Sequence, residues 1–258
     1  MVLKIGILSG KGGVAKTTTA INLAYAIKNF NYDVTLIDAN FFTPNVGVFL
    51  GVSKTPVSLQ DVLRQKRNIT QAVYMHSSGI KIVPSSLSNI DLKPSQIDRL
   101  QSVLYGLDGL TEYIILDSPA GLGKESISTI KASDSILIVV NPNLASITDA
   151  LKTIKIAQSL NKKILGIVVT RVHNDNTELK INNIETMLDY PVLGVVPEDS
   201  KVRLALLNKE IITQKNPKSV VSIEYKKIAS KILEEQYNES SDEEKFSYKL
   251  LKKFGLKK

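Results

Sequence analysis

Glycine, lysine and threonine residues are concentrated in one short stretch, residues 9–18, which reads SGKGGVAKTT. Glycines let a backbone approach a ligand closely and turn its N–H groups inward, where they surround phosphate oxygens. The lysine and threonine at the end of the stretch have the spacing of a cation for the β- and γ-phosphates followed by a hydroxyl for Mg²⁺. The stretch therefore predicts a phosphate-binding loop, made by Gly10, Lys11, Gly12, Gly13, Val14, Ala15, Lys16, Thr17 and Thr18.

The surroundings of this loop support the prediction. The apolar run LKIGIL at 3–8 precedes it, and a helical pattern over 16–29 follows it. A helix that begins at the loop adds the positive end of its dipole to the anion site. The alternative is a glycine-rich turn between strand and helix that binds nothing, and the strand–loop–Lys–Thr–helix order favours the phosphate site.

Two aspartates follow apolar runs and form a second group with chemical potential. Asp38 ends VTLID and Asp117 ends YIILD. A carboxylate at a strand end beside a phosphate loop can hold Mg²⁺ directly or through water. A strand-end aspartate can instead begin a turn or cap a helix. Two of them beside one loop favour a metal site, formed by Thr17, Asp38 and Asp117.

Alternating strands and helices must bring these residues together. Short β-branched runs without period-2 alternation suit parallel strands covered on both faces. We expect strands at 3–8, 34–38, 80–84, 113–117, 135–140, 164–170 and 192–197, and helices at 16–29, 59–67, 94–105, 147–160, 177–189 and 223–235. This order predicts an α/β fold with a doubly wound, mainly parallel sheet, whose ligands bind beyond the carboxyl ends of the strands.

Composition limits the chemistry and the location. The 258 residues include no cysteine, which excludes disulfides, thiolate metal sites and iron–sulfur ligation, and the two histidines, His76 and His173, are too few for a histidine-rich metal site. The first residues lack the basic start and the cleavage signal of a secretory peptide, and no run approaches the ~20 apolar residues of a membrane-spanning helix. We therefore expect a cytoplasmic protein.

Charge is distributed unevenly along the chain. The net charge is +8, and residues 245–258 contain six lysines and no acid, so subtracting six leaves +2 for residues 1–244. The polar, acidic stretch QYNESSDEE separates this end from the rest. We divide the chain into a P-loop ATPase domain at 1–235, a flexible linker at 236–244 and a basic amphipathic helix at 245–258.

The basic end has the pattern of a helix that lies on a membrane. On a helical wheel, four apolar residues fall within an arc of about 140°, and three lysines lie outside it. Such a helix places apolar side chains in the acyl boundary and lysines among anionic headgroups. The alternative is a helix that packs on its own domain, or a solvated basic end. The apolar residues are Phe246, Leu250, Leu251 and Phe254, and the lysines are Lys249, Lys252 and Lys253.

The motifs resemble a known family. KGGVAKTT is similar to the deviant Walker A signature K-G-G-x-x-K-[ST] of the MinD/ParA ATPases, and the resemblance to MinD members continues through DANFFTPN, LDSPAGLG, NPNLASITDALKT, VVTRVHN and GVVPED. It implies a parallel α/β sheet with a P-loop, ATP and Mg²⁺ as cofactors, and a homodimer with ATP at its interface. In this family the lysine matching Lys11 reaches the partner's phosphates. The alternative is that Lys11 is a solvated surface lysine with no role in the site.

The same resemblance implies further site residues. Thr170 and Arg171 match a pair that lies against adenine, and Asp149 matches a position near the dimer face. Pro197, Glu198 and Asp199 match the loop that closes over the base. Each of these residues could instead serve simple turn chemistry.

Two residues depart from the expected patterns. Family members have a second aspartate that positions the attacking water where this chain has Asn40, and an amide can orient water but cannot accept a proton. We therefore expect Lys11, Lys16, Asp38 and Asn40 to support only slow hydrolysis. Ala15 replaces the glycine of the standard loop, and we expect it to weaken binding through a strain of about 1–3 kcal/mol.

Four functions compete. We favour a MinD-like ATP-dependent switch, held peripherally and reversibly on the inner face of the cell membrane, that helps to position division or polar structures together with an activator or cargo protein. A ParA-like DNA-partition ATPase is the alternative, although the near-neutral body makes nucleic acid an unlikely partner. An iron–sulfur carrier is opposed by the absence of cysteine, and a non-hydrolysing scaffold is suggested by Asn40.

Overall fold

Eight strands form one sheet in the computed structural model, which describes residues 2–237 apart from residues 53, 89–90 and 174. Their order across the sheet is β3-β4-β2-β5-β1-β6-β7-β8, and every neighbouring pair is parallel except β3 with β4. The strands are β1 Leu3–Leu8, β2 Val34–Asp38, β3 Tyr74–Met75, β4 Lys81–Val83, β5 Tyr113–Asp117, β6 Ser135–Val140, β7 Lys163–Val172 and β8 Val192–Pro197. From β1 the chain forms β2, β3 and β4 on one side, returns to place β5 between β1 and β2, and then adds β6, β7 and β8 on the other side, so the predicted doubly wound sheet is confirmed.

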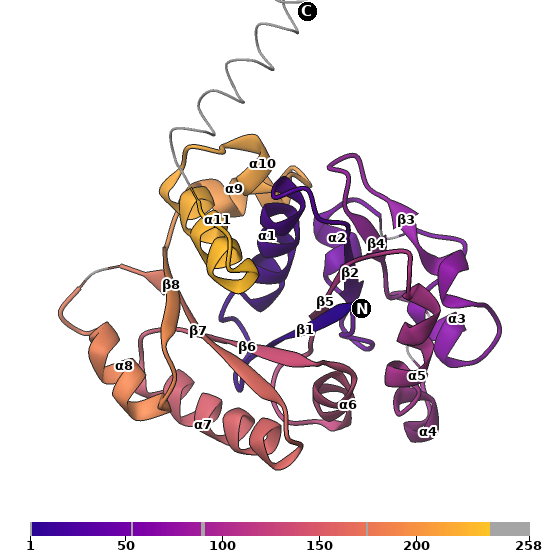
Figure 1. The fold of residues 1–258 in the computed structure, drawn as a ribbon, viewed down its shortest axis with the longest axis horizontal. Coiled ribbons are helices and arrows are strands. Elements are labelled where there is room, and N and C mark those ends of the chain that lie inside the picture. Colours follow the sequence, from indigo (N-terminus) through magenta and orange to yellow (C-terminus); the bar gives the residue numbers. More distant parts are fainter. Residues whose placement is uncertain (1, 53, 89–90, 174, 238–258) are drawn as a thin grey trace, which may run out of the picture.

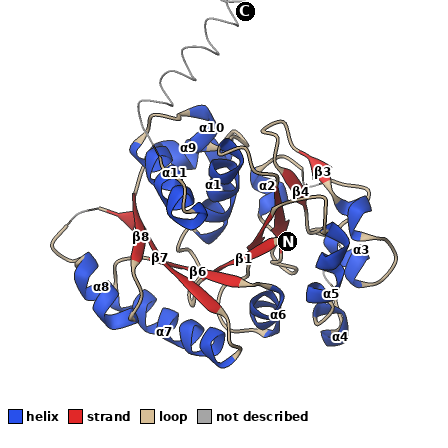
Figure 2. Cartoon of the chain, viewed as in Figure 1, coloured by secondary structure: helices blue, strands red, loops and turns tan. Residues whose placement is uncertain are grey.

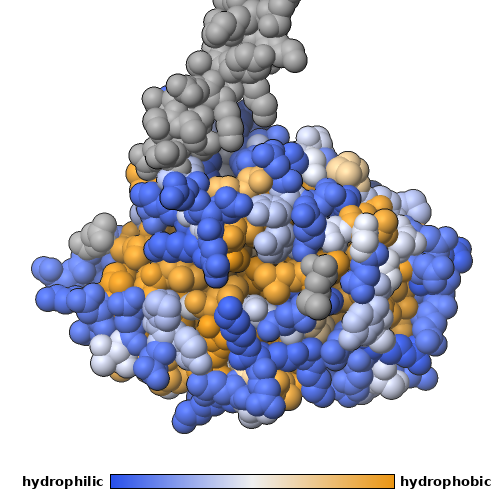
Figure 3. Space-filling view, viewed as in Figure 1, coloured by the Kyte–Doolittle hydropathy of each residue, from blue (hydrophilic) through white to orange (hydrophobic). Residues whose placement is uncertain are grey.

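Helices cover both faces of this sheet (Figures 1 and 2). The α-helices are α1 Lys16–Asn29, α2 Val46–Phe49, α3 Leu59–Leu63, α4 Pro94–Ile97, α5 Leu100–Leu104, α6 Lys124–Ala132, α7 Leu144–Ser159, α8 Ile181–Leu188, α9 Ser200–Leu207, α10 Ile212–Lys215 and α11 Val220–Leu233. Two 3₁₀ turns, Ile69–Ala72 and Tyr105–Leu107, lie among them. In Figure 3 a band of hydrophobic residues crosses the middle of the visible face between hydrophilic borders, as expected where a buried sheet lies between two helical layers.

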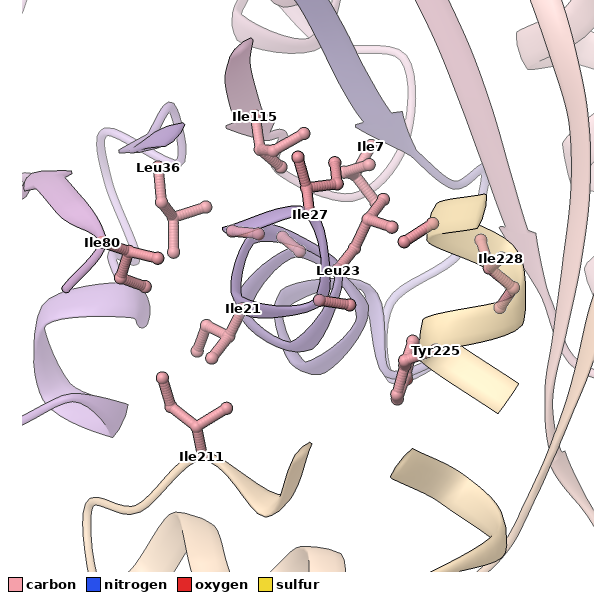
Figure 4. Close-up of a cluster of buried hydrophobic side chains, with 14 of the residues drawn as sticks. Ile7, Ile21, Leu23, Ile27, Leu36, Ile80, Ile115, Ile211, Tyr225 and Ile228 are labelled. Atoms are coloured by element: carbon pink, nitrogen blue, oxygen red, sulfur yellow. The ribbon is translucent and has the colours of Figure 1, made fainter. Parts of the chain in front are cut away.

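One of the two layers positions the phosphate loop. Helices α1 and α11 lie side by side on the sheet, and their apolar residues join those of β1, β2 and β5 in one core (Figures 1 and 4). Leu23 and Ile27 of α1 are fully buried there, together with Ile228 of α11. Burying side chains of this size stabilises the fold by roughly 1.5–3 kcal/mol each. The helix that begins at the loop therefore has little freedom to move relative to the sheet.

Several predicted boundaries are wrong by one turn or more. The segment 94–105 is two short helices, because the chain bends at Asp98 and Arg99. Helix α7 begins three residues before the predicted start, since Asn143 caps it by accepting the N–H of Ser146 at 2.9 Å. The helix expected at 59–67 ends at Leu63, and those expected to begin at 177 and 223 begin at Ile181 and Val220.

The sequence analysis also missed elements. Helix α6 has only two isoleucines in its nine residues, so its apolar pattern is weak. Strand β3 has two residues, and α2 and α10 have four each, which is too short for periodicity to emerge.

The predicted C-terminal segments lie largely outside the described residues. Residues 236 and 237 of the predicted linker are described, and residues 238–258, which include the predicted basic helix, are not. Within the described part of the chain, no helix has the length and apolar character needed to cross a bilayer.

Candidate functional site

The loop between β1 and α1 has the shape that its glycines suggest. Residues 11–13 are exposed at its tip, whereas Lys16 is 9% exposed. Gly13 has φ 79°, and Ala15 has φ 62° and ψ 31°, the left-handed region that L-residues other than glycine, asparagine and aspartate seldom adopt. For an alanine this conformation costs about 1–2 kcal/mol. The predicted strain at Ala15 is therefore present in the backbone.

Close packing explains the first glycine of the loop. A Cβ atom on Gly10 would lie 2.2 Å from the carbonyl oxygen of Asp149 in α7. Asp149 thus contacts the loop through its backbone, while its carboxylate forms a 3.0 Å ion pair with Lys152. Asp149, which the resemblance placed near a dimer face, therefore packs directly against the phosphate loop.

Side chains of β7, α1 and α11 hold the loop through hydrogen bonds. The hydroxyl of Thr170 on β7 donates to the carbonyl oxygen of Val14 at 2.8 Å and is 1% exposed. The hydroxyl of Thr19 donates to the carbonyl oxygen of Ala15 at 3.0 Å and lies 3.2 Å from the hydroxyl of Tyr225 on α11. A strained backbone conformation such as that of Ala15 persists only where surrounding groups hold it, and these hydrogen bonds do so.

The two predicted metal carboxylates lie next to each other. Asp38 and Asp117 are register partners at the carboxyl ends of β2 and β5, and both are fully buried. Burial raises the pKa of Asp117, and the charge of Lys16 and the hydrogen bond from Thr17 partly oppose this. Burial and then the neighbouring Asp117 raise the pKa of Asp38 well above its ordinary value. Two carboxylates in one buried site favour binding of a cation between protein and ligand.

The oxygen atoms of the two aspartates are used differently. Both oxygens of Asp38 accept backbone N–H groups from the loop that follows it, Asn40 at 3.2 Å and Val46 at 2.9 Å. Asp117 Oδ2 accepts the hydroxyl of Thr17 at 2.6 Å, and Asp117 Oδ1 is buried without a hydrogen-bond partner in the described residues. A ligand, an ion or a water molecule could satisfy this oxygen.

These residues fit Mg²⁺. A hydroxyl that donates to Asp117 keeps its lone pairs for a cation, so Thr17 and Asp117 Oδ1 would hold the ion, and Asp38 would organise the adjoining loop. Nowhere in the described ranges do three His, Cys, Asp or Glu side chains form a metal cluster. Few protein ligands are typical of Mg²⁺ that is bound together with a substrate phosphate.

The side chain of Asn40 is occupied within its own loop. Its amide nitrogen donates to the carbonyl oxygen of Thr43 at 2.6 Å, and its amide oxygen accepts the Thr43 hydroxyl at 2.9 Å. Asn40 is 8% exposed. In this conformation the amide stabilises the turn at 40–43. Because both of its polar atoms already bond Thr43, the amide has little remaining hydrogen-bonding capacity with which to orient water.

A recess lies beside the loop, where the resemblance places the nucleobase. Its lining includes Ala15, Thr18 and Tyr225. It also includes all five residues that the resemblance assigned to the base, namely Thr170, Arg171, Pro197, Glu198 and Asp199. Arg171 also has a positive φ, 56°, at a register shift of β7 with β8.

The edge of the recess is charged. Glu198 lies between Arg171, at 3.8 Å, and Arg203, at 3.9 Å. Asp199 caps α9 by accepting the N–H of Lys201 at 2.8 Å. Because both arginines are half or more exposed, these ion pairs contribute little to stability and are free to rearrange around a ligand.

The structure thus brings most of the predicted site residues to one end of the sheet. Lys11 is exposed at the tip of the loop, whereas Asp38 and Asp117 are fully buried. Sequence reasoning missed Thr19 and Tyr225. Thr19 looked like one more helical residue, and Tyr225 lies more than 200 positions away, in a helix without a motif.

Comparison with known proteins identifies the family. Residues 2–233 match the ParA family, described as NUBPL iron-transfer P-loop NTPase. An uncharacterized ATP-binding protein of Methanocaldococcus jannaschii is 38% identical over 248 residues, which cover 96% of this chain and 94% of that relative.

Solved structures agree with this match. The cell division ATPase MinD of Pyrococcus furiosus has a TM-score of 0.85 and 28% identity, over 91% of this chain and 99% of that one. The septum site-determining protein MinD of Pyrococcus horikoshii, solved with Mg-ADP, has a TM-score of 0.84 and 27% identity, over 90% and 96%. The predicted fold and enzyme class are confirmed: this chain belongs to the ParA family of P-loop NTPases.

Proposed function

We propose that this protein is a MinD-like ATP-dependent switch that dimerises when it binds Mg-ATP and associates with the cytoplasmic face of the cell membrane through residues 245–258. In this role it helps to position division or polar structures. The observation that carries the proposal is the arrangement of the loop at 9–18 beside Asp117, whose unpartnered buried oxygen and bonded Thr17 fit Mg²⁺. The similarity to two MinD structures supports ATP as the nucleotide.

Each part of the site has a role in this proposal. Backbone N–H groups of residues 10–18 surround the phosphates, and the buried Lys16 supplies a cation beside them. Mg²⁺, when bound, neutralises phosphate charge. Lys11, exposed at the tip, reaches the phosphates of a second copy, so the nucleotide becomes part of the dimer interface.

Slow hydrolysis follows from the position of Asn40. The amide cannot accept a proton, and both of its polar atoms bond Thr43. The same observation favours a second candidate function, an ATP-binding scaffold that does not hydrolyse the nucleotide. A switch and a scaffold differ in whether the bound state ends by hydrolysis.

Membrane association is proposed from the sequence of the C-terminal end. A single short amphipathic helix binds a bilayer weakly, and two on one dimer bind together with an avidity gain of about 10²–10⁴. Because dimerisation depends on ATP, membrane attachment would depend on ATP as well. An activator or cargo protein would then end or use the attached state.

Titration with ATP and Mg²⁺, measured together with phosphate release, tests the nucleotide step. The proposal expects micromolar or tighter binding, very slow phosphate release and faster release in Asn40→Asp. Absence of binding at millimolar Mg-ATP would contradict the proposal. Binding with no release in either form would favour the scaffold.

Co-sedimentation with anionic vesicles tests the membrane step. The full chain is compared with a chain that ends at residue 244, each with and without ATP. We expect ATP-dependent pelleting of the full chain alone. Equal pelleting of both chains, or pelleting that ignores ATP, would refute the membrane switch, and salt-sensitive retention on DNA by the shortened chain would instead support a DNA-partition role.

A further inference from the structure

Tyr225 is a buried side chain that motif-based reasoning leaves without a role. It projects from α11 toward α1 (Figure 4) and is 1% exposed. Its hydroxyl lies 3.2 Å from the hydroxyl of Thr19. When Thr19 donates its single proton to the carbonyl oxygen of Ala15, at 3.0 Å, the Tyr225 hydroxyl is the donor to Thr19.

This pair of bonds ends at the strained residue of the phosphate loop. The carbonyl oxygen of Ala15 accepts both the N–H of Thr19, at 2.9 Å, and its hydroxyl. Ala15 has the left-handed conformation that an alanine adopts only when its surroundings impose it. Tyr225 thereby fixes the hydroxyl that fixes the Ala15 carbonyl.

Tyr225 also lines the recess beside the loop, together with Ala15 and Thr18. It therefore connects three parts of the molecule: helix α11, the wall of the recess and the loop backbone. Any shift of α11 relative to α1 would reach the loop through this hydroxyl.

We propose that Tyr225 is a positioning residue for the phosphate loop, which it holds through Thr19 in the conformation that binds a nucleoside triphosphate. This inference rests on the proposed function, in which the loop binds Mg-ATP. Without the hydroxyl, a smaller fraction of molecules has the competent loop, and the apparent affinity falls by that fraction.

Tyr225→Phe removes only the hydroxyl and is the direct test. The loss of one buried hydrogen bond predicts a roughly 3- to 10-fold increase in the Kd for Mg-ATP. Thr19→Val removes the middle of the chain of bonds and should weaken binding to a similar extent. The double variant should be no weaker than the weaker single variant, because both changes interrupt one chain of bonds.

Tyr32→Phe is the matched control. Tyr32 follows α1, and its hydroxyl donates to Glu235, just beyond α11, at 2.8 Å. This variant also removes one tyrosine hydroxyl that joins the α1 region to the α11 region, but at the end away from Ala15. We expect its Kd for Mg-ATP to stay within about twofold of the unmodified protein.

Magnesium tripolyphosphate separates loop positioning from a role in shaping the recess. It lacks the base and the ribose, so a positioning role predicts the same fold-loss for tripolyphosphate as for ATP in Tyr225→Phe. The inference is overturned if ATP alone is affected, if both Kd values stay within twofold, or if Tyr32→Phe has an equal effect. Failure of the unmodified protein to bind Mg-ATP would instead refute the proposed function itself. If Tyr225→Phe does not fold, the Thr19→Val variant and the same two ligands decide the question.

Discussion

At the scale of single residues, the fully buried side-chain nitrogen and oxygen atoms of the described residues each have at least one hydrogen-bond partner, with two exceptions. Those exceptions are Asp117 Oδ1 and the hydroxyl of Thr35. The first belongs to Asp117, which accepts the Thr17 hydroxyl in the candidate magnesium site, and the second belongs to the second residue of β2, which is not among the candidate site residues. The same type of defect therefore has a functional reading in one place and a purely energetic one in the other.

Thr35→Val should stabilise the protein. The hydroxyl is buried without a partner in the described part of the chain, so a methyl group of the same shape removes a desolvation cost of about 1–2 kcal/mol. Denaturant unfolding would show a higher midpoint at unchanged slope.

Thr111→Val provides the control for this change. The Thr111 hydroxyl lies 2.9 Å from the carbonyl oxygen of Asp33 and 3.0 Å from that of Tyr113. The same substitution should destabilise the protein by about 1 kcal/mol here. If the free energy of unfolding shifts in the same direction in Thr35→Val and Thr111→Val, hydrogen bonding of the two hydroxyls does not explain their effects.

Tyr225 should make stability fall at high pH. Burial raises its pKa to about 12 from an ordinary value of 10.0. A raised folded-state pKa means that the stabilising contribution is complete below pH 10 and is lost as the pH rises toward 12. The loss is about 3 kcal/mol.

The measurement compares the free energy of unfolding of the unmodified protein with that of Tyr225→Phe between pH 9 and 12. The difference isolates Tyr225, because every other tyrosine and lysine titrates in both proteins. Curves that stay parallel over this range would show that Tyr225 ionises as it does in water.

At the scale of elements, the phosphate loop depends on its fit against α7 as much as on its own conformation. The backbone of Gly10 lies against the backbone of Asp149, and the carbonyl groups of Val14 and Ala15 are held by β7 and α1. The loop is therefore a junction of several elements, and a change in one element is transmitted to it.

Gly10→Ala should disrupt that junction. Its new Cβ would lie 2.2 Å from a backbone oxygen, so the loop and α7 must separate. We expect a loss of about 2 kcal/mol or more in the free energy of unfolding, together with loss of nucleotide binding. Calorimetric unfolding and Mg-ATP titration would measure the two effects.

Gly12→Ala is the matched control for stability. A Cβ at that position would be 3.8 Å from Ala120, an ordinary contact. Its thermal midpoint should stay close to that of the unmodified protein. An equal drop in both variants would show that loop flexibility, rather than the contact with Asp149, is what the first glycine provides.

At the scale of the whole molecule, the phosphate loop and the end of α11 are connected through α1. The loop begins α1, Tyr225 joins α11 to it, and the described chain ends shortly after α11 with Glu235 bonded to Tyr32. One hydrogen bond therefore joins α1 to α11 near the loop, and a second joins the residues that follow the two helices.

Lys11→Ala should separate nucleotide binding from dimerisation. Lys11 is exposed at the tip of the loop, so in the proposed switch a monomer should still bind Mg-ATP within about threefold, whereas the ATP-dependent dimer should be lost. Analytical ultracentrifugation with and without Mg-ATP would measure the change. A dimer that persists in Lys11→Ala would show that this lysine is a solvated surface residue with no role in dimerisation.

Lys16→Ala is the comparison for Lys11. Lys16 is buried beside Asp117, so its loss should abolish binding itself, and with it any dimer. The two lysines of the loop would then have different phenotypes, one for binding and one for assembly.

The sequence alone determined the fold class, the phosphate loop and the two strand-end aspartates. Continuous apolar runs in a β–α order identify parallel strands, and glycine, lysine and threonine at fixed spacing identify the loop, because both signals are local in the chain. Helix boundaries were less certain, since capping by residues such as Asn143 decides them.

Only the tertiary structure decided how the site is supported. Long-range contacts have no spacing that a single sequence can display, so the roles of Thr19 and Tyr225, the contact of Gly10 with Asp149 and the unpartnered oxygen of Asp117 emerged only when β1, β7, α7 and α11 were assembled. Asn40 shows the same limit. Its identity predicted a side chain that can orient water but cannot accept a proton, and the fold showed that its amide is bonded to Thr43.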